Sequence, residues 1–224
     1  MHQVRRPVQT PRDLREGVLT HERLEGAREE DDREIWRRHF FYLALFAAAF
    51  HTLQFLASFL LWKTTASPVL MSFGLDAAVS AIAALVLATR IQREWRNKFV
   101  AYGYMTAGAI ALSLGGSALW SGQQPKSTIL GIAVAAISML VIPIVGSYMK
   151  SLAVELRSQA LKSAAIFTFG NSYLSMVLLI AMLMSYAMNL RWGDPLGALV
   201  MFPFVAQKGI QILLEEGKHE YVED

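Results

Sequence analysis

Six apolar stretches, separated by short polar segments, dominate this chain of 224 residues. We place them at 40–62, 68–90, 99–121, 127–149, 160–188 and 193–214. Each is long enough to cross a bilayer as a helix, which takes about 20 residues at ~1.5 Å of rise per residue. None alternates apolar with polar residues as a membrane β-barrel strand does, so helices are required. The sequence therefore predicts an all-α integral membrane protein with six transmembrane helices.

Basic residues mark every second loop, which gives the expected orientation. The loops after spans two and four hold Arg90, Arg93, Arg96, Lys98, Lys150, Arg157 and Lys162. The loops after spans one, three and five hold only Lys63, Lys126 and Arg191. Because cytoplasmic loops carry the excess of Lys and Arg, both termini are predicted to be cytoplasmic. We expect a multi-pass protein of the cell (inner) membrane.

The chain divides into one membrane domain with two tails. Residues 1–38 form a polar cytoplasmic N-terminal segment, whose start, with Pro7 and Pro11, is predicted to be disordered. From Thr20 the segment is rich in helix formers and is expected to extend the first span. Residues 39–214 form the six-helix transmembrane domain, and residues 215–224 form a short cytoplasmic tail.

Composition excludes several classes of protein. With 54% hydrophobic and 17% charged residues the chain is too apolar for an ordinary soluble domain. It has no cysteine, so a disulfide, a thiolate metal site and a cysteine nucleophile are all excluded. The net charge of +3 comes from basic residues at span ends, which indicates a lipid bilayer as partner and no nucleic acid. No phosphate loop, HExxH motif or Ser/His/Asp set is visible, so we expect neither an enzyme nor a bound cofactor.

Asp76 is the carboxylate in the middle of the apolar run from Pro68 to Thr89. At ~1.5 Å per residue it lies about 12 Å inside the run, near the midplane of the bilayer. An Asp at that depth costs roughly 2.5–3.5 kcal/mol on insertion scales. This cost favours an ion or proton site. The alternative is an Asp that only hydrogen-bonds a neighbouring helix.

Polar residues form three stripes at helical spacing. They are Ser72, Asp76 and Ser80 on span two, Thr168, Asn171, Ser172 and Ser175 on span five, and His51, Gln54 and Ser58 on span one. Converging oxygen and imidazole groups can replace part of an ion's hydration shell. For single serines and threonines, hydrogen bonding between packed helices is the favoured interpretation. For Asp76 with Asn171 we favour an ion site.

Two further features of the spans bear on assembly and chemistry. His51 could ligate a metal, shuttle protons or hydrogen-bond a carbonyl; because no second histidine lies inside a span, bis-His haem ligation is excluded. Gly108, Gly115 and Gly116 make span three suitable for close helix packing.

Four segments, taken in order, resemble the cation diffusion facilitator (cation efflux) family, and the resemblance covers about residues 40–216. They are SPVLMSFGLD in span two, AYGYMTAGAIAL in span three, SQALKSAAIFTFGNSYLS in span five and WGDPLGALVMFPFVAQKGIQILLEE in span six. Members of this family are proton-coupled exporters of divalent cations with six spans and both termini inside. Only the membrane domain is matched, because no segment corresponds to the family's C-terminal cytoplasmic domain.

The resemblance also implies a transport site and a quaternary structure. The family's four ligand positions on spans two and five fall on Asp76, Ser80, Phe167 and Asn171. Asp76 is kept, Ser80 and Asn171 offer neutral oxygens, and Phe167 offers no ligand, so the metal site is degenerate. Since relatives are dimers, a homodimer through the membrane helices is expected, with span three as the candidate contact.

These observations lead to two interpretations of function. The first is a membrane transporter that exports a cation, expected to be divalent and proton-coupled, through an atypical site made by Asp76, Asn171, Ser80 and His51. The second is a transport-inactive cation-efflux relative that acts as a binding or partner subunit.

Overall fold

The computed structural model describes residues 11–89, 98–123, 125–126 and 128–220, and this part of the chain forms six α-helices. They are α1 (Pro11–Thr65), α2 (Pro68–Thr89), α3 (Lys98–Trp120), α4 (Ile129–Glu155), α5 (Gln159–Ala187) and α6 (Gly193–Glu220). Each contains a stretch that is long and apolar enough to cross a membrane. The six predicted transmembrane helices are therefore confirmed, and the predicted spans agree with α2 and α3 to within a residue or two.

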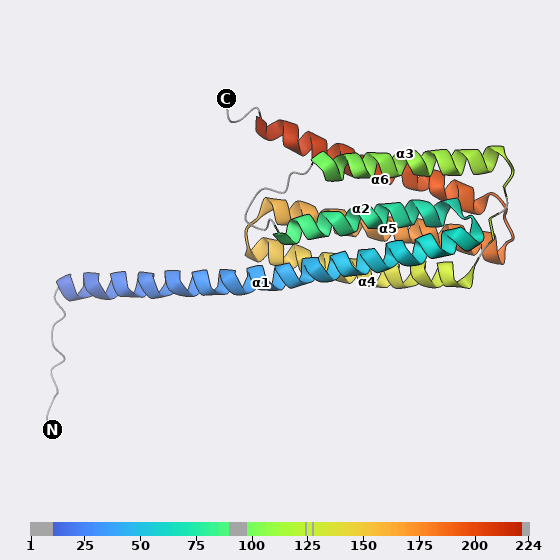
Figure 1. The fold of residues 1–224 in the computed structure, drawn as a ribbon. Helices are drawn as coiled ribbons and strands as arrows, with labels where there is room; N and C mark the ends of the chain where they lie inside the picture. The colour runs from blue at the N-terminus through green and yellow to red at the C-terminus, as the bar shows by residue number, and fades with distance from the viewer. Residues whose placement is uncertain (1–10, 90–97, 124, 127, 221–224) are drawn as a thin grey trace, which may run out of the picture.

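The first helix is much longer than its span. It has 55 residues and begins at Pro11, a residue whose fixed φ suits the first helical position. The predicted helical extension from Thr20 is present and starts earlier than expected, whereas Pro7 lies outside the described residues. Figure 1 shows this extension projecting from the bundle at the end where α6 also finishes. Which end is cytoplasmic stays a prediction.

The helices form two groups. Helices α1, α2, α4 and α5 lie together, and α3 and α6 form a pair along one side of them (Figure 1). The most extensive contacts join α1 with α2, α4 with α5, and α3 with α6. The pair meets the other four helices mainly through α2 and α5. Any interaction between α6 and α2 or α5 therefore ties the two groups together.

The small residues of α3 pack against α6 within the chain. A Cβ added to Gly115 would lie 2.9 Å from the Pro195 carbonyl oxygen, and one added to Gly108 would lie 3.3 Å from the Ala206 nitrogen. At Gly115 a side chain would force one of the two helices to shift, whereas at Gly108 it would make a tight contact. Gly116, in contrast, has no neighbour within 4 Å. The close packing predicted for this span is thus made with α6.

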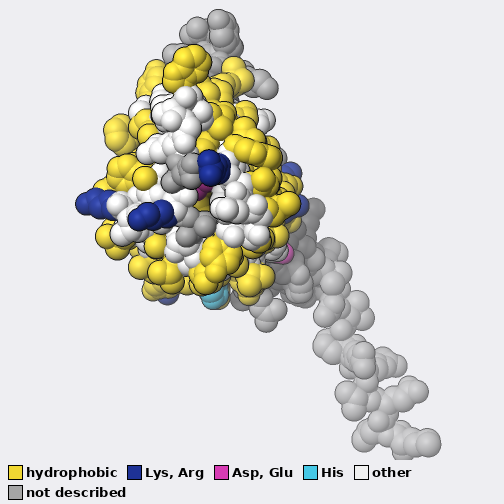
Figure 2. Space-filling model, turned by 90° about the vertical axis from the view of Figure 1, so that its right-hand side faces the viewer, with side chains coloured by type: hydrophobic (Ala, Val, Ile, Leu, Met, Phe, Trp, Pro, Cys, Tyr) yellow, Lys and Arg dark blue, Asp and Glu magenta, His cyan; other side chains and the backbone are white. Residues whose placement is uncertain are grey.

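The outside of the bundle matches a membrane environment. Large aliphatic side chains such as Leu53, Leu140 and Ile144 are well exposed along its sides. Figure 2 looks onto the end opposite the α1 extension, where hydrophobic side chains surround a face with basic and uncharged polar groups. An apolar belt with polar ends is the surface expected of a protein in a lipid bilayer.

At that end, Asp194 of α6 caps the N-terminus of α2. Its Oδ2 accepts a hydrogen bond from Ser67 Oγ, and its Oδ1 accepts one from the Val69 amide at 3.1 Å. Ser67 Oγ in turn accepts from the Leu70 amide at 3.2 Å. The first amides of a helix have no partner within the helix, and a carboxylate there is also favoured by the helix dipole. Asp194 is buried, and its role is structural.

Replacing Asp194 with alanine should therefore destabilise the fold by about 1–3 kcal/mol, because a buried amide and a buried hydroxyl lose their acceptor. Thermal unfolding in detergent measures the loss. Asp194→Asn keeps one acceptor oxygen and should lose less. Equal unfolding temperatures for Asp194→Ala and the wild type would contradict this capping role.

Candidate cation site

Asp76 is paired with a lysine that the sequence analysis did not single out. Lys208, on α6, places its Nζ 2.7 Å from Asp76 Oδ1. Both residues are buried, with 2% of Asp76 and 5% of Lys208 exposed. The cost of an unpaired charge inside a membrane applies to Lys208 as much as to Asp76. That argument, applied to the QKGIQ segment, would have found the lysine.

Asn171, on α5, is the second partner of the Lys208 ammonium group. Its Oδ1 accepts a hydrogen bond from Lys208 Nζ, while its Nδ2 donates to Ser80 Oγ at 3.1 Å. The same Nδ2 lies 3.4 Å from His51 Nε2. Tyr104 of α3 completes the surroundings, since its hydroxyl lies 3.0 Å from Ser80 Oγ and its ring centre 5.2 Å from Lys208 Nζ. The ammonium is thus held by a carboxylate, an amide oxygen and an aromatic face.

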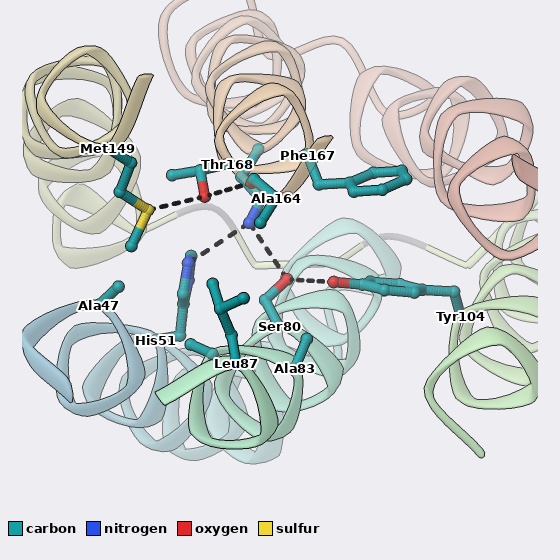
Figure 3. Close-up of a pocket in the computed structure, with 12 residues that line it drawn as sticks. Ala47, His51, Ser80, Ala83, Leu87, Tyr104, Met149, Ala164, Phe167 and Thr168 are labelled. Carbon is teal, nitrogen blue, oxygen red and sulfur yellow. Dashed lines mark hydrogen bonds between the residues drawn. The ribbon is translucent and has the colours of Figure 1, made fainter. Parts of the chain in front are cut away.

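The four residues proposed from sequence as a metal site do lie together. Asp76, Ser80, His51 and Asn171 are all buried, and they belong to one hydrogen-bonded cluster through Asn171 and Lys208. Figure 3 shows His51, Ser80 and Tyr104 directed towards the same space. Whether this cluster binds a transported ion stays a prediction.

Several other members of the three stripes bond their own helix, and Thr168 Oγ1 also lies 3.6 Å from Met149 Sδ of α4. Ser72, Thr168 and Ser175 each donate to the carbonyl four residues earlier in their own helix. Ser58 Oγ and Ser172 Oγ are buried without a hydrogen-bond partner in the described part of the chain. For these residues the interpretation as ordinary helix serines and threonines is the better one.

Hydrogen bonds also connect His51 to α4, on the side away from Lys208. Its Nδ1 lies 2.6 Å from Gln54 Oε1, and Gln54 Nε2 donates to Ser138 Oγ at 2.6 Å. Ser138 Oγ donates to the Val134 carbonyl, also at 2.6 Å. The polar contacts therefore run from α6 through α5 and α1 to α4.

A small cavity of about 30 Å³ adjoins the cluster. His51, Ser80, Tyr104 and Asn171 line its polar part, and Phe167 narrows it (Figure 3). The remaining walls include Ala47, Leu87, Met149 and Ala164. These belong to the half of the bundle nearer the α1 extension. A cavity of this size, with several polar groups on one side, has room for one or two water molecules.

The chemistry of the cluster is that of an internally neutralised carboxylate. Asp76 contributes one negative charge and Lys208 one positive charge, while Ser80, Asn171 and His51 contribute neutral polar groups. Within the described residues no group of three or more His, Cys, Asp or Glu side chains could hold a metal ion. The site lacks the imidazole, thiolate and carboxylate set that zinc prefers. Its centre is instead occupied by the ammonium group of the protein's own lysine.

Comparison with known families identifies the fold. The model of the cation efflux transmembrane domain matches residues 44–218 of this chain. The chain belongs to the cation efflux family. Within this family the six-helix bundle is a multi-pass membrane domain, and membership supports cation transport, rather than enzymatic catalysis, as its general function. No curated protein matches the chain.

Proposed function

We propose that this cation efflux protein is a cation–proton exchanger in which the transported cation and protonated Lys208 compete for Asp76. The observation that supports it is the buried contact of 2.7 Å between Lys208 Nζ and Asp76 Oδ1. In the exchange, a cation binds Asp76, the Lys208 ammonium leaves as a neutral amine, and one proton is released to water. The reverse step reprotonates Lys208 and releases the cation.

The cost of a buried unpaired charge makes the two partners exchangeable. Removing one member of a buried ion pair typically costs 3–5 kcal/mol, because the other is left uncompensated. The ionised carboxylate of Asp76 therefore needs a positively charged partner at every stage. That partner is either the Lys208 ammonium or a bound cation. Lysine suits this role since its ammonium can lose a proton when buried, which an arginine does not do.

Charge balance also bears on which cation is accepted. A singly charged cation that replaces the ammonium leaves the cluster neutral, whereas a divalent cation leaves it with one excess positive charge. Excess charge in a low-dielectric interior is unfavourable. We therefore propose a singly charged cation as the better substrate, while the divalent ion expected from the resemblance stays a prediction.

The helix arrangement supports alternating exposure of the site. Lys208 and Tyr104 belong to the α3–α6 pair, whereas Asp76 and Asn171 belong to the other group. When a cation displaces Lys208, the polar ties between the two groups weaken, which favours movement of one group against the other. The cavity beside Asn171 is lined partly by residues from the half of the bundle that bears the α1 extension, so we propose that water and cations reach the site from that end.

Flux through liposomes that contain the purified protein and a pH-sensitive dye tests the proposal. Gradients of Li⁺, Na⁺, K⁺, Mg²⁺, Mn²⁺ and Zn²⁺ are imposed one at a time. At least one cation should drive proton movement, and Asp76→Asn should abolish it because the only carboxylate of the cluster is lost. Lys208→Gln should lower proton movement per cation at least tenfold.

Lys150→Gln is the matched control, since Lys150 lies exposed near the end of α4 and should leave exchange unchanged. If Asp76→Asn exchanged as fast as the wild type, the transport site would lie elsewhere.

The second candidate function is a transport-inactive relative in which Lys208 permanently fills the cation position. Among the described residues no cluster of three or more His, Cys, Asp or Glu side chains could hold a metal ion, and this favours the inactive relative. Wild-type liposomes that behave like empty ones for every cation tested would favour this function over exchange.

Assembly and location complete the proposal. We propose that the protein acts in the cell membrane, and a homodimer through the membrane helices stays a prediction. Because Gly108 and Gly115 are buried against α6, the surface of α3 that remains for a second copy is its outward face with Ala109, Ser113 and Gly116.

A further inference from the structure

The hydrogen bonds between α4 and Lys208 form a chain with a fixed direction. At one end the Val134 carbonyl can only accept, so Ser138 Oγ, at 2.6 Å, donates its single proton there. Ser138 must then accept from Gln54, which places the Gln54 amide nitrogen at Ser138 and its oxygen at His51. At the other end the Lys208 ammonium can only donate.

This direction determines the tautomer of His51. Since Gln54 Oε1 accepts at 2.6 Å, His51 Nδ1 carries the proton. In a neutral imidazole Nε2 is then an acceptor, and it faces Asn171 Nδ2 at 3.4 Å. The Asn171 amide is therefore oriented with its nitrogen towards His51 and its oxygen towards Lys208.

Ser80 does not impose the same orientation. Its hydroxyl lies near both Asn171 Nδ2 and the Tyr104 hydroxyl, and it can rotate to donate or accept. In the Nδ1–H form of His51, Nε2 can only accept. Of the two groups that face Asn171 Nδ2, His51 is the one that distinguishes between the two orientations of the amide.

We propose that His51, Gln54 and Ser138 are positioning residues that hold the Asn171 carbonyl oxygen towards the place of the Lys208 ammonium. With respect to the transported cation this inference rests on the proposed function. When the ammonium leaves, it no longer orients the amide itself. The series of hydrogen bonds that begins at α4 then keeps the Asn171 oxygen, and not its N–H group, directed at the incoming cation.

Nitrogen NMR of the full-length protein labelled with ¹⁵N-histidine tests this series of hydrogen bonds without any transport assay. At about pH 9 a histidine side chain is neutral, so the two ring nitrogens report the tautomer. His51→Gln assigns the His51 signals among the five histidines. The wild type should show the Nδ1–H form. Because the Lys208 ammonium also fixes this tautomer through Asn171, the effect of Ser138 is measured in a background with Asp76→Asn and Lys208→Met, which removes both charges together. This background should keep the Nδ1–H form, and adding Ser138→Ala should give a mixture because Gln54 is then free to turn over.

Ser151→Ala, made in the same uncharged background, is the matched control on the same helix. Ser151 is exposed and donates only to the Ser147 carbonyl at 3.2 Å, so its removal should leave the His51 tautomer unchanged. A wild-type spectrum of the Nε2–H form, or the same tautomer with and without Ser138→Ala in the uncharged background, overturns the proposal.

The second readout is the cation dependence of exchange. Loss of one oriented ligand should raise the KM for the cation about tenfold in Ser138→Ala, with a smaller change in the maximal rate. An unchanged KM overturns the link to transport. If the tautomer is as expected but no cation drives proton movement, the exchange function fails, while the orientation of Asn171 towards Lys208 stands.

Discussion

Lys208→Gln is expected to destabilise the protein by about 3–5 kcal/mol, because it leaves Asp76 buried without a compensating charge. The wild-type contact between Lys208 Nζ and Asp76 Oδ1 is 2.7 Å long, and both side chains are almost fully enclosed. Asp76→Asn should cost a similar amount, since the ammonium then loses its negative partner and is left with neutral amide oxygens, that of Asn171 and that of the introduced side chain, as acceptors. Thermal unfolding of the purified chain in detergent measures both losses.

The double variant separates the ion pair from simple packing. Asp76→Asn with Lys208→Gln removes both charges, and amides can hydrogen-bond each other, so the pair should be more stable than either single variant. Such non-additivity is the signature of a direct interaction. Lys150→Gln, at an exposed site, should change stability by no more than about 0.5 kcal/mol. Strictly additive losses for the two single variants would show that the charges do not stabilise each other.

The helical framework was predictable because the bilayer fixes the length of each element. A span needs about 20 apolar residues, and each apolar stretch here has that length. The chain offers no alternating pattern that would compete with a helix. Asp76 was predictable for the same reason, since a carboxylate eight residues inside α2 is expensive wherever its helix packs.

Lys208 was harder to recognise because of its position in α6. It lies six residues before Leu214, where the apolar part of the helix ends. A lysine within two turns of a span end can extend its long side chain to the interface, so the sequence alone allowed an ordinary interfacial residue. Its partner Asp76 is separated from it by 132 positions along the chain. Only the packing of α6 against α2 shows that the two charges meet.

The route from His51 to α4 was also outside the reach of sequence patterns. Ser138 is an isolated polar residue in an apolar span, and by itself it has the features of any serine that bonds its own helix. Its importance comes from its distance of 2.6 Å to Gln54 Nε2. The polar stripe of span one predicted that His51 and Gln54 share a face, but not which helix they meet.

Asn171→Asp combined with Lys208→Met is expected to turn the cluster into a divalent cation site. The double variant removes the internal ammonium and adds a second carboxylate, so the cluster changes from neutral to a charge of −2. A divalent cation then restores neutrality, which it does not do in the wild type. Carboxylate and neutral oxygens suit Mn²⁺ or Mg²⁺, and adding Phe167→His should increase the preference for Zn²⁺ by supplying an imidazole.

Cation-dependent thermal stabilisation is the measurement, because an ion that binds only the folded state stabilises it by about 2.7 kcal/mol at a concentration of 100 times its Kd. Mn²⁺ should raise the unfolding temperature of the double variant and leave that of the wild type unchanged. Asn171→Asp alone is the control: its new carboxylate remains beside the Lys208 ammonium, so the gain in divalent binding should be small. If Asn171→Asp alone bound Mn²⁺ as well as the double variant, Lys208 would not be the group that excludes divalent cations. If neither variant responded to any divalent cation, the space between Asp76 and Asn171 would be unsuited to a metal ion, and the built-in ammonium would be the only cation that it accepts.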